Sequence, residues 1–194
     1  HGLYISYAIE GGETMSGADL KRHVENAVGA PLSGNITVLY RGNPTATKGQ
    51  GARLDASSSA LRSVASELVG TARADTLRAG ILNSTLDGGT GGDSMIGAQG
   101  ADIFYVDNVG TTKVVDASQA AKLGDIVVAN DTRDTIRSSV SLDLNRRCTI
   151  GADTFFQYSG VGAVQLLGTA GLTASGYNDA ATHLVGNVGS NKLT

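Results

Sequence analysis

Aspartates that recur in phase with glycines give this sequence its clearest chemical signal. Four nine-residue units follow one another without a gap between residues 70 and 105. The sixth position of these units holds Asp75, Ser84, Asp93 and Asp102. Carboxylate and carbonyl oxygens are the ligands that calcium prefers, and glycine lets the backbone approach an ion closely. The spacing therefore predicts Ca²⁺ binding through the turns of a repeated unit.

The eighth position of every unit is large and apolar, and it holds Leu77, Leu86, Met95 and Phe104. The third unit, residues 88–96, matches the pattern Gly-Gly-x-Gly-x-Asp-x-U-x, where U is a large apolar residue. One unit cannot bury its apolar side chain alone, so stability must come from stacking. Because two units make one coil, we expect the turn at 70–75 beside that at 88–93, and the turn at 79–84 beside that at 97–102.

These repeats resemble the hemolysin-type calcium-binding repeats of secreted bacterial RTX proteins, which form a parallel β-roll. The resemblance is strongest over residues 87–107 and weaker over 135–142 and 167–170. It implies a mainly β fold, with a parallel β-roll or β-solenoid over residues 70–194 whose C-terminal repeats are degenerate. It leaves residues 1–69 without a match.

The family pattern implies which residues bind the metal. They belong to the turns and are Asp75, Gly88, Gly89, Gly91, Asp93, Gly97, Gly100 and Asp102. Three residues depart from the pattern: Ser84 replaces an aspartate, and Arg73 and Leu82 stand where glycines are expected.

These departures predict unequal sites. We expect one good calcium site on the Asp75 and Asp93 side, and a weaker site on the Asp102 side because Ser84 carries no charge. In the last unit, residues 186–194, Asn191 takes the aspartate position, which predicts a structural coil without an ion. The alternative for the whole repeat is a calcium-free, glycine-rich β-solenoid.

Two acids after the repeat, Asp107 and Asp116, have two interpretations. They either complete a site at the rim of the repeat or are solvated acids of a surface loop. The rest of this segment predicts short strands near residues 113–115, 125–128 and 135–144, with a turn at 131–134.

Residues 1–69 predict a small α/β domain of unknown role. Strand-like runs cover residues 3–9 and 35–40, and helical spacing covers residues 16–28. A second helix is predicted at 57–69, where Leu61, Val64, Ala65 and Leu68 fall on one face and Gly70 closes the segment. The domain boundary is predicted between residues 69 and 70.

Composition limits the functional classes. The 194-residue chain has a formal net charge of −3 and lacks the clustered Lys and Arg of a nucleic-acid interface. Cys148 is the only cysteine, so no intrachain disulfide can form. In a secreted domain, a bound metal would be the natural substitute as a stabilising cross-link. No apolar run is long enough for a transmembrane segment. The N-terminus lacks a signal-peptide pattern and an initial Met, so we expect a processed product or a fragment.

No catalytic motif is found, neither a His-Glu-x-x-His zinc site nor a Gly-x-Ser-x-Gly nucleophile elbow. We therefore expect a non-enzymatic, calcium-folded structural or adhesion module, secreted or at the bacterial cell surface. The family resemblance implies type I secretion in an unfolded state. Expected partners are calcium ions, further copies of the chain or a cell-surface polysaccharide. The alternative is a non-catalytic C-terminal module of a secreted protease, lipase or polysaccharide-active enzyme.

Overall fold

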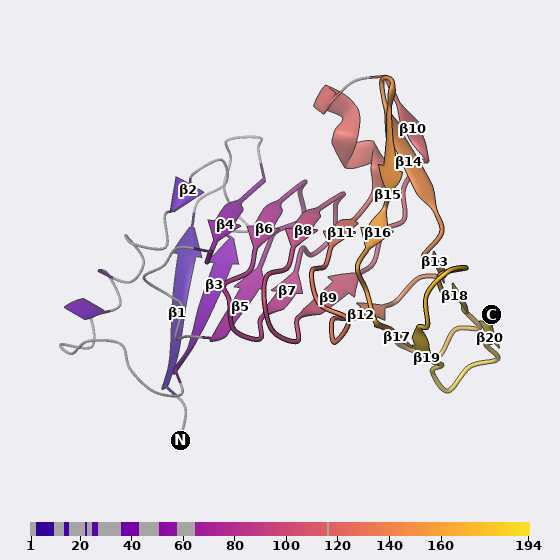
Figure 1. The fold of residues 1–194 in the computed structure, drawn as a ribbon. Coiled ribbons are helices and arrows are strands. Elements are labelled where there is room, and N and C mark those ends of the chain that lie inside the picture. The colour runs from indigo at the N-terminus through magenta and orange to yellow at the C-terminus, as the bar shows by residue number, and fades with distance from the viewer. Residues whose placement is uncertain are drawn as a thin grey trace.

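The computed structural model describes residues 3–9, 14–15, 22, 25–26, 36–42, 51–57, 65–115 and 117–194. Its architecture is mainly β, and its two large sheets are parallel throughout, so the expected mainly β class is confirmed (Figure 1). No helix among the described residues is long and apolar enough to cross a membrane.

The larger sheet has eight strands in the order β1-β3-β5-β7-β9-β12-β17-β19. Its strands are β1 (Leu3–Ile9), β3 (Ile36–Gly42), β5 (Ala65–Val69), β7 (Thr85–Asp87), β9 (Ile103–Val106), β12 (Thr135–Ser138), β17 (Ala163–Leu166) and β19 (His183–Val185). The second sheet has six strands in the order β16-β11-β8-β6-β4-β2. Its strands are β2 (Thr14–Met15), β4 (Arg53–Asp55), β6 (Thr76–Arg78), β8 (Ser94–Ile96), β11 (Ile126–Val128) and β16 (Tyr158–Ser159).

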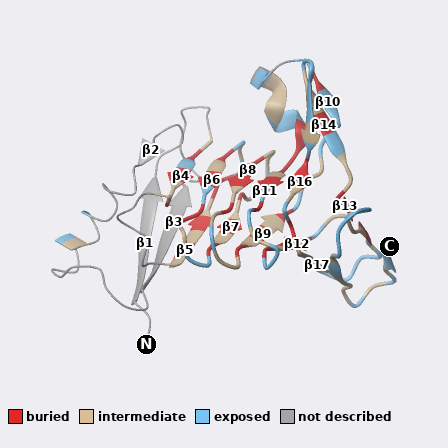
Figure 2. Cartoon of the chain, viewed as in Figure 1, coloured by how far each residue is buried: buried red, intermediate tan, exposed pale blue. Residues whose placement is uncertain are grey.

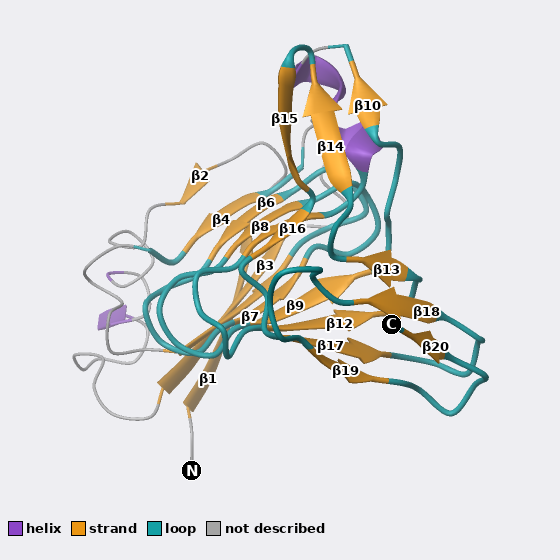
Figure 3. Cartoon of the chain, turned by 45° about the vertical axis from the view of Figure 1, so that its right-hand side comes forward, coloured by secondary structure: helices purple, strands orange, loops and turns teal. Residues whose placement is uncertain are grey.

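From β4 to β9 the chain alternates between the two sheets, so each sheet gains every second strand. Short loops join the two layers, as the turned view of Figure 3 shows. The turns that end in the repeated aspartates are among these loops, which is why the topology stacks one turn beside another.

Two small sheets complete the described structure. One contains β13 (Leu142–Asp143), β18 (Thr173–Ser175) and β20 (Lys192–Leu193). The other contains β10 (Lys113–Val114) and the hairpin of β14 (Arg147–Ile150) and β15 (Asp153–Phe156). This sheet and the 3-10 helix η2 (Ala117–Leu123) project from the large sheets in Figure 1. We call them the side lobe, and they bury their own cluster of Val114, Leu123 and Cys148.

The core consists of two in-register columns of apolar side chains that face each other between the large sheets. The column of the six-stranded sheet is Leu54, Leu77, Met95, Val127 and Tyr158. The column of the eight-stranded sheet includes Leu68, Leu86, Phe104, Ile136 and Val164. These side chains are at most 1% exposed and form one cluster, seen as the red interior of Figure 2. The inward position predicted for the eighth residue of each unit is confirmed.

The stack continues beyond the repeat that the sequence revealed. Met95 pairs with Val127 and Phe104 pairs with Ile136, although 32 residues separate Asp93 from Asp125 where 18 separate Asp75 from Asp93. The extra residues form β10 and η2 of the side lobe. An insertion therefore interrupts the sequence period without interrupting the stack.

The helix predicted at residues 57–69 is wrong for residues 65–69, which the structure describes as a strand. Residues 65–69 of the predicted helix 57–69 form β5, which pairs with β3 on one side and β7 on the other. Ser66 and Leu68 are buried and alternate with less buried residues, the period of a strand. Two neighbouring strands satisfy the backbone of this segment, which outweighs a helical spacing of apolar residues. Residues 58–64 lie outside the described part.

The other elements predicted for residues 1–69 fare differently. The strands predicted at 3–9 and 35–40 are confirmed as β1 and β3. Of the predicted helix 16–28 only Arg22, Glu25 and Asn26 are described, and these are helical. Because β1, β3 and β5 belong to the same sheet as β7 and β9, the hydrogen-bonded sheet crosses the predicted boundary between residues 69 and 70.

Candidate metal centre

The repeated aspartates form two rows of turns, each residue directly preceding a strand. We call Asp75, Asp93 and Asp125, which precede β6, β8 and β11, the first turn row. The second turn row is Ser84, Asp102 and Asp134, which precede β7, β9 and β12. All six residues are at most 3% exposed.

Within each row, a carboxylate binds the backbone of the turn before it. Asp93 Oδ1 accepts a hydrogen bond from the Asp75 N–H at 2.8 Å, and Asp125 Oδ1 accepts one from the Asp93 N–H at 3.1 Å. Asp102 Oδ1 and Asp134 Oδ1 accept corresponding bonds in the second row from Ser84 and Asp102, each at 2.7 Å. The predicted neighbourhood of the turns at 70–75 and 88–93, and of those at 79–84 and 97–102, is confirmed.

The second carboxylate oxygen is normally satisfied within its own turn. Oδ2 of Asp75 accepts the N–H of Thr71 at 2.5 Å, and Oδ2 of Asp102 accepts the N–H of Ala98 at 2.9 Å. Asp134 Oδ2 accepts the N–H of Asn130 at 3.1 Å. In each case the donor lies four residues before the aspartate, at the second position of the same nine-residue unit.

Asp93 is the exception. Its Oδ2 is buried and has no hydrogen-bond partner in the described part of the chain. The equivalent donor, the Gly89 N–H, instead donates to Asp87 Oδ1 at 3.0 Å. Gly89 has φ +77°, a left-handed conformation that glycine adopts without strain. Asp87 thus accepts the backbone hydrogen bond that the Gly89 N–H would otherwise donate to Asp93.

Glycine is also required beside this oxygen for steric reasons. A Cβ atom at Gly88 would lie 2.2 Å from Asp93 Oδ2, far inside van der Waals contact. A Cβ at Gly89 would lie 2.2 Å from the Thr71 carbonyl oxygen, and one at Gly91 would lie 2.5 Å from the Arg73 carbonyl oxygen. The glycines therefore let carbonyl oxygens of the turn at 70–75 lie against the turn at 88–93.

Several negatively charged side chains surround Asp93. Burial is the main cause that raises the pKa of Asp93 to about 8; the charges of Asp125, Asp75 and Asp107 contribute to this rise, and the Asp75 N–H opposes it. Burial and the Asp87 charge also raise the pKa of Asp107. The pKa of Asp102 rises only to about 6, because burial is offset by the N–H groups of Ala98 and Ser84.

Side-chain donors occupy carbonyl oxygens in both turn rows. Asn108 Nδ2 donates to the Gly91 carbonyl oxygen, and Asn130 Nδ2 donates to that of Gly97 at 2.8 Å. Ser84 Oγ donates to the Leu82 carbonyl oxygen at 2.9 Å. These carbonyl oxygens already accept a hydrogen bond from a neutral side chain, so they are less available to bind a cation.

The donor set determines which metal could bind here. Among the described residues, no three His, Cys, Asp or Glu side chains converge as a metal cluster. A cation at Asp93 would therefore need main-chain oxygens as well as carboxylates. Calcium accepts such mixed oxygen ligands with flexible geometry, whereas zinc and other soft metals favour nitrogen and sulfur.

The predicted ligands fall into two groups. Asp75, Gly88, Gly89, Gly91 and Asp93 lie together in adjacent turns of the first row. Gly97, Gly100 and Asp102 lie in the second row, where a Cβ at Gly100 would meet Asn83 Oδ1 at 2.7 Å. Both Asp102 oxygens already accept backbone N–H groups there.

Sequence reasoning missed Asp125 and Asp134 as members of the rows. A signal was present, because each stands two residues before a buried apolar strand residue, Val127 or Ile136, as in the repeat. The acid considered for a rim site, Asp107, donates its N–H to Asp125 Oδ2 at 3.0 Å and influences Asp93 electrostatically. Asp116 lies outside the described residues.

The last unit has a polar rather than a charged turn. Asn191 Nδ2 donates to Asn187 Oδ1 at 2.8 Å, and Asn187 Nδ2 donates to the Leu167 carbonyl oxygen at 2.8 Å. Leu193, in the apolar position of this unit, is 41% exposed. The amides supply both donors and acceptors in this turn.

Comparison with protein-family models, curated proteins and solved structures finds no match to this chain.

Proposed function

We propose that this chain is an extracellular, calcium-folded structural or adhesion module whose stacked turns form a parallel β-roll. The single observation that carries the proposal is the buried, unpartnered Oδ2 of Asp93. A buried carboxylate oxygen without a hydrogen bond or counter-ion is costly, since its charge has lost the solvation of water. A bound cation removes that cost.

The neighbourhood of Asp93 supplies further oxygen atoms. The Asp75 carboxylate lies in the adjoining turn, and the Gly88 carbonyl oxygen would lie 2.4 Å from a Cβ at Gly70. Asp107 and Asp125 add negative charge. These groups repel one another without an ion and are cross-linked by one, so metal binding stabilises the folded stack.

The arrangement favours one principal ion per chain. Asp93 is the only turn-row aspartate among the described residues whose carboxylate has an oxygen without a partner. Asn130 and Ser84 supply donors to two carbonyl oxygens of the second row, and Asn108 supplies one to the Gly91 carbonyl of the first, so the bare oxygen of Asp93 is what distinguishes the first row. Calcium binding at the first row is consistent with the unequal sites that the sequence predicts.

Calcium titration of chelator-treated protein tests the proposal. We expect calcium to raise Tm, with stabilisation of about 2.7 kcal/mol when free calcium is one hundred times Kd. Asp93→Asn should abolish this rise, because it removes the charge without changing side-chain size. Asp153→Asn is a matched control, since Asp153 is an exposed residue of the side-lobe hairpin. A calcium response equal in both variants, or none in the parent protein at millimolar calcium, would contradict the proposal.

A further inference from the structure

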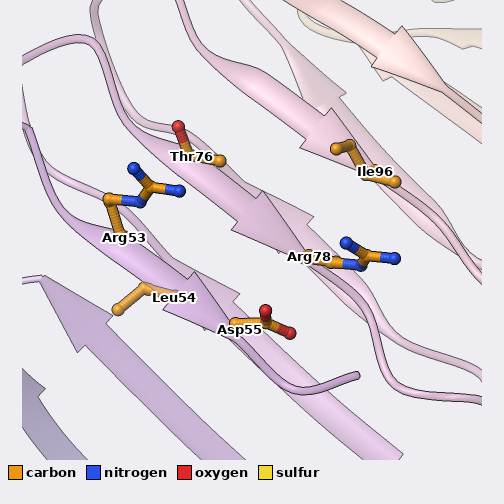
Figure 4. Close-up of a pocket in the computed structure, with 6 residues that line it drawn as sticks. All are labelled: Arg53, Leu54, Asp55, Thr76, Arg78 and Ile96. Atoms are coloured by element: carbon orange, nitrogen blue, oxygen red, sulfur yellow. The ribbon is translucent and has the colours of Figure 1, made fainter. Parts of the chain in front are cut away.

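The outer face of the six-stranded sheet carries a cavity that the calcium proposal does not use. Its volume is about 150 Å³ and it is lined by Arg53, Leu54, Asp55, Thr76, Arg78 and Ile96 (Figure 4). These residues come from β4, β6 and β8. We call it the arginine pocket.

Strand register places two arginines diagonally across this pocket. Arg53 pairs with Thr76, and Asp55 pairs with Arg78, on adjacent parallel strands. The two arginines lie on neighbouring strands and are offset by two residues along the strand direction. Ordinary strand geometry therefore places their Cα atoms roughly 8 Å apart. The alternate residues Leu54 and Leu77 are buried in the core, so both guanidinium groups stand on the solvent side.

Neither Arg53 nor Arg78 has an ion-pair partner among the described residues. Asp55 is the register neighbour of Arg78, but its Oδ1 accepts the Ser57 N–H at 2.8 Å and forms no ion pair with that arginine. Other arginines of the described chain are engaged: Arg133 pairs with Asp131, and Arg147 stacks on Phe156. The cavity is therefore lined by two exposed guanidinium groups without an ion-pair partner in the described part of the chain.

We propose that the arginine pocket binds a carboxylate or sulfate group of an acidic polysaccharide. Guanidinium groups bind such oxyanions through paired, charge-assisted hydrogen bonds. Thr76 also lines the pocket, directly across from Arg53 and two residues before Arg78 on β6. Its hydroxyl group can bind a sugar hydroxyl that flanks the anionic group.

The lining of the pocket disfavours two other polyanions. It contains no aromatic side chain on which a nucleic-acid base could stack. A membrane surface attracts clusters of basic residues beside exposed apolar ones, whereas this pocket has two arginines, one acid and a half-buried Ile96. A hydroxylated, sparsely charged polymer fits this combination better.

Asp55 gives the pocket a built-in selectivity element. Its carboxylate repels an incoming anion, so it weakens binding of any anion that does not gain further contacts. Replacing it with Asn removes the repulsion and keeps the acceptor for the Ser57 N–H. Asp55→Asn should therefore strengthen binding, which few purely structural roles of Asp55 would produce.

Binding of immobilised polygalacturonate and dextran sulfate, with neutral dextran as reference, tests this inference in calcium-containing buffer. Arg53→Gln and Arg78→Gln should each weaken binding about tenfold, the loss expected for one charge-assisted contact. Lys113→Gln is the control, because it removes the same charge from the exposed β10 of the side lobe. Unchanged Tm of the variants in calcium separates loss of the pocket from loss of the fold.

The outcomes are distinct. Binding to either acidic polymer that the arginine variants weaken, Asp55→Asn strengthens and Lys113→Gln leaves unchanged supports the pocket, and the preferred polymer identifies carboxylate or sulfate. Equal weakening by Lys113→Gln, binding to neutral dextran alone, or preference for single-stranded DNA or anionic phosphatidylglycerol vesicles overturns it. None of these results depends on whether calcium binds at Asp93, which the thermal titration measures separately.

Discussion

The two turn rows share a sequence pattern but treat their aspartates differently. In the second row, both oxygens of Asp102 accept backbone N–H groups, from Ser84 and Ala98. In the first row, Asp93 receives only the Asp75 N–H, because Asp87 accepts the remaining donor at Gly89. The same residue type at the same position is thus a structural acceptor in one turn and an unsatisfied charge in the other.

This difference shows that a repeat motif alone does not define a metal site. The aspartate provides the charge, but neighbouring donors determine whether that charge is already satisfied. A carboxylate with two N–H partners gains little from an ion, whereas one with a bare buried oxygen gains much. The comparison therefore predicts different responses of Asp93 and Asp102 to the same substitution.

The largest contrast is expected from replacing each aspartate by asparagine in metal-free protein. Asp93→Asn removes a buried charge and leaves an amide where no donor opposes it, so it should stabilise the chelator-treated chain at pH 8 by on the order of 3 kcal/mol. Asp102→Asn also removes a buried charge, but it places an amide N–H₂ against a backbone donor, which costs about 1–3 kcal/mol, so its net effect should be clearly smaller. Urea unfolding in chelator measures both. Equal stabilisation by the two variants would show that Asp93 and Asp102 are equivalent.

The pH dependence of metal-free stability should separate the same two residues. The folded-state pKa is raised from 3.8 to about 6 for Asp102 and to about 8 for Asp93. A raised carboxyl pKa means that the folded chain binds more protons, so stability is greatest near pH 4 and falls as pH rises through these values. In chelator, Tm should decrease from pH 5 to pH 8.

Calcium should reverse the upper part of this profile, because the ion binds the deprotonated carboxylate. The calcium-induced rise in Tm should therefore grow between pH 6 and pH 8. Asp93→Asn should flatten the metal-free decrease above pH 6, while a variant outside the rows, Asp153→Asn, should retain it. A metal-free Tm that rises over this interval would contradict the charge balance deduced for Asp93.

Much of the stack was predictable because it depends on spacing. The inward positions of Leu77 and Phe104 follow from a strict period of nine, which the pairing of alternate strands requires. Asp125 was missed because the insertion that forms β10 and η2 breaks this period. The strand β5 was missed because Leu68 fits a helical face as well as an alternating one, and only its pairing with β3 and β7 distinguishes them.

The residues of the candidate site were predictable from the sequence, but the hydrogen bonds that distinguish Asp93 from Asp102 were not. The sequence predicted a weaker site on the Asp102 side from the missing charge of Ser84, whereas the structure shows that both oxygens of Asp102 accept backbone N–H groups. Which acceptor receives the Gly89 N–H depends on the conformation of a glycine-rich turn. The spacing of residues does not indicate whether this N–H donates to Asp87 or to Asp93, so the effect of Asp87 on Asp93 could not be predicted.

The smallest predicted effect tests that influence directly. Asp87→Ala frees the Gly89 N–H to donate to Asp93 Oδ2, as the corresponding donors do for Asp75 and Asp102. Metal-free stability at pH 8 should rise by about 1 kcal/mol, the net gain of one hydrogen bond, and calcium affinity should fall several-fold. Calorimetric titration and thermal melting measure the two changes.

Asp87→Asn is the matched control, because its Oδ1 can still accept the Gly89 N–H while its charge is lost. If Asp87 acts by withdrawing this donor, the asparagine variant should keep calcium affinity close to that of the parent protein. If Asp87 instead contributes its charge or binds the ion, both variants should lose affinity equally. Equal losses would mean that the first row differs from the second through its number of carboxylates rather than through the direction of one backbone N–H.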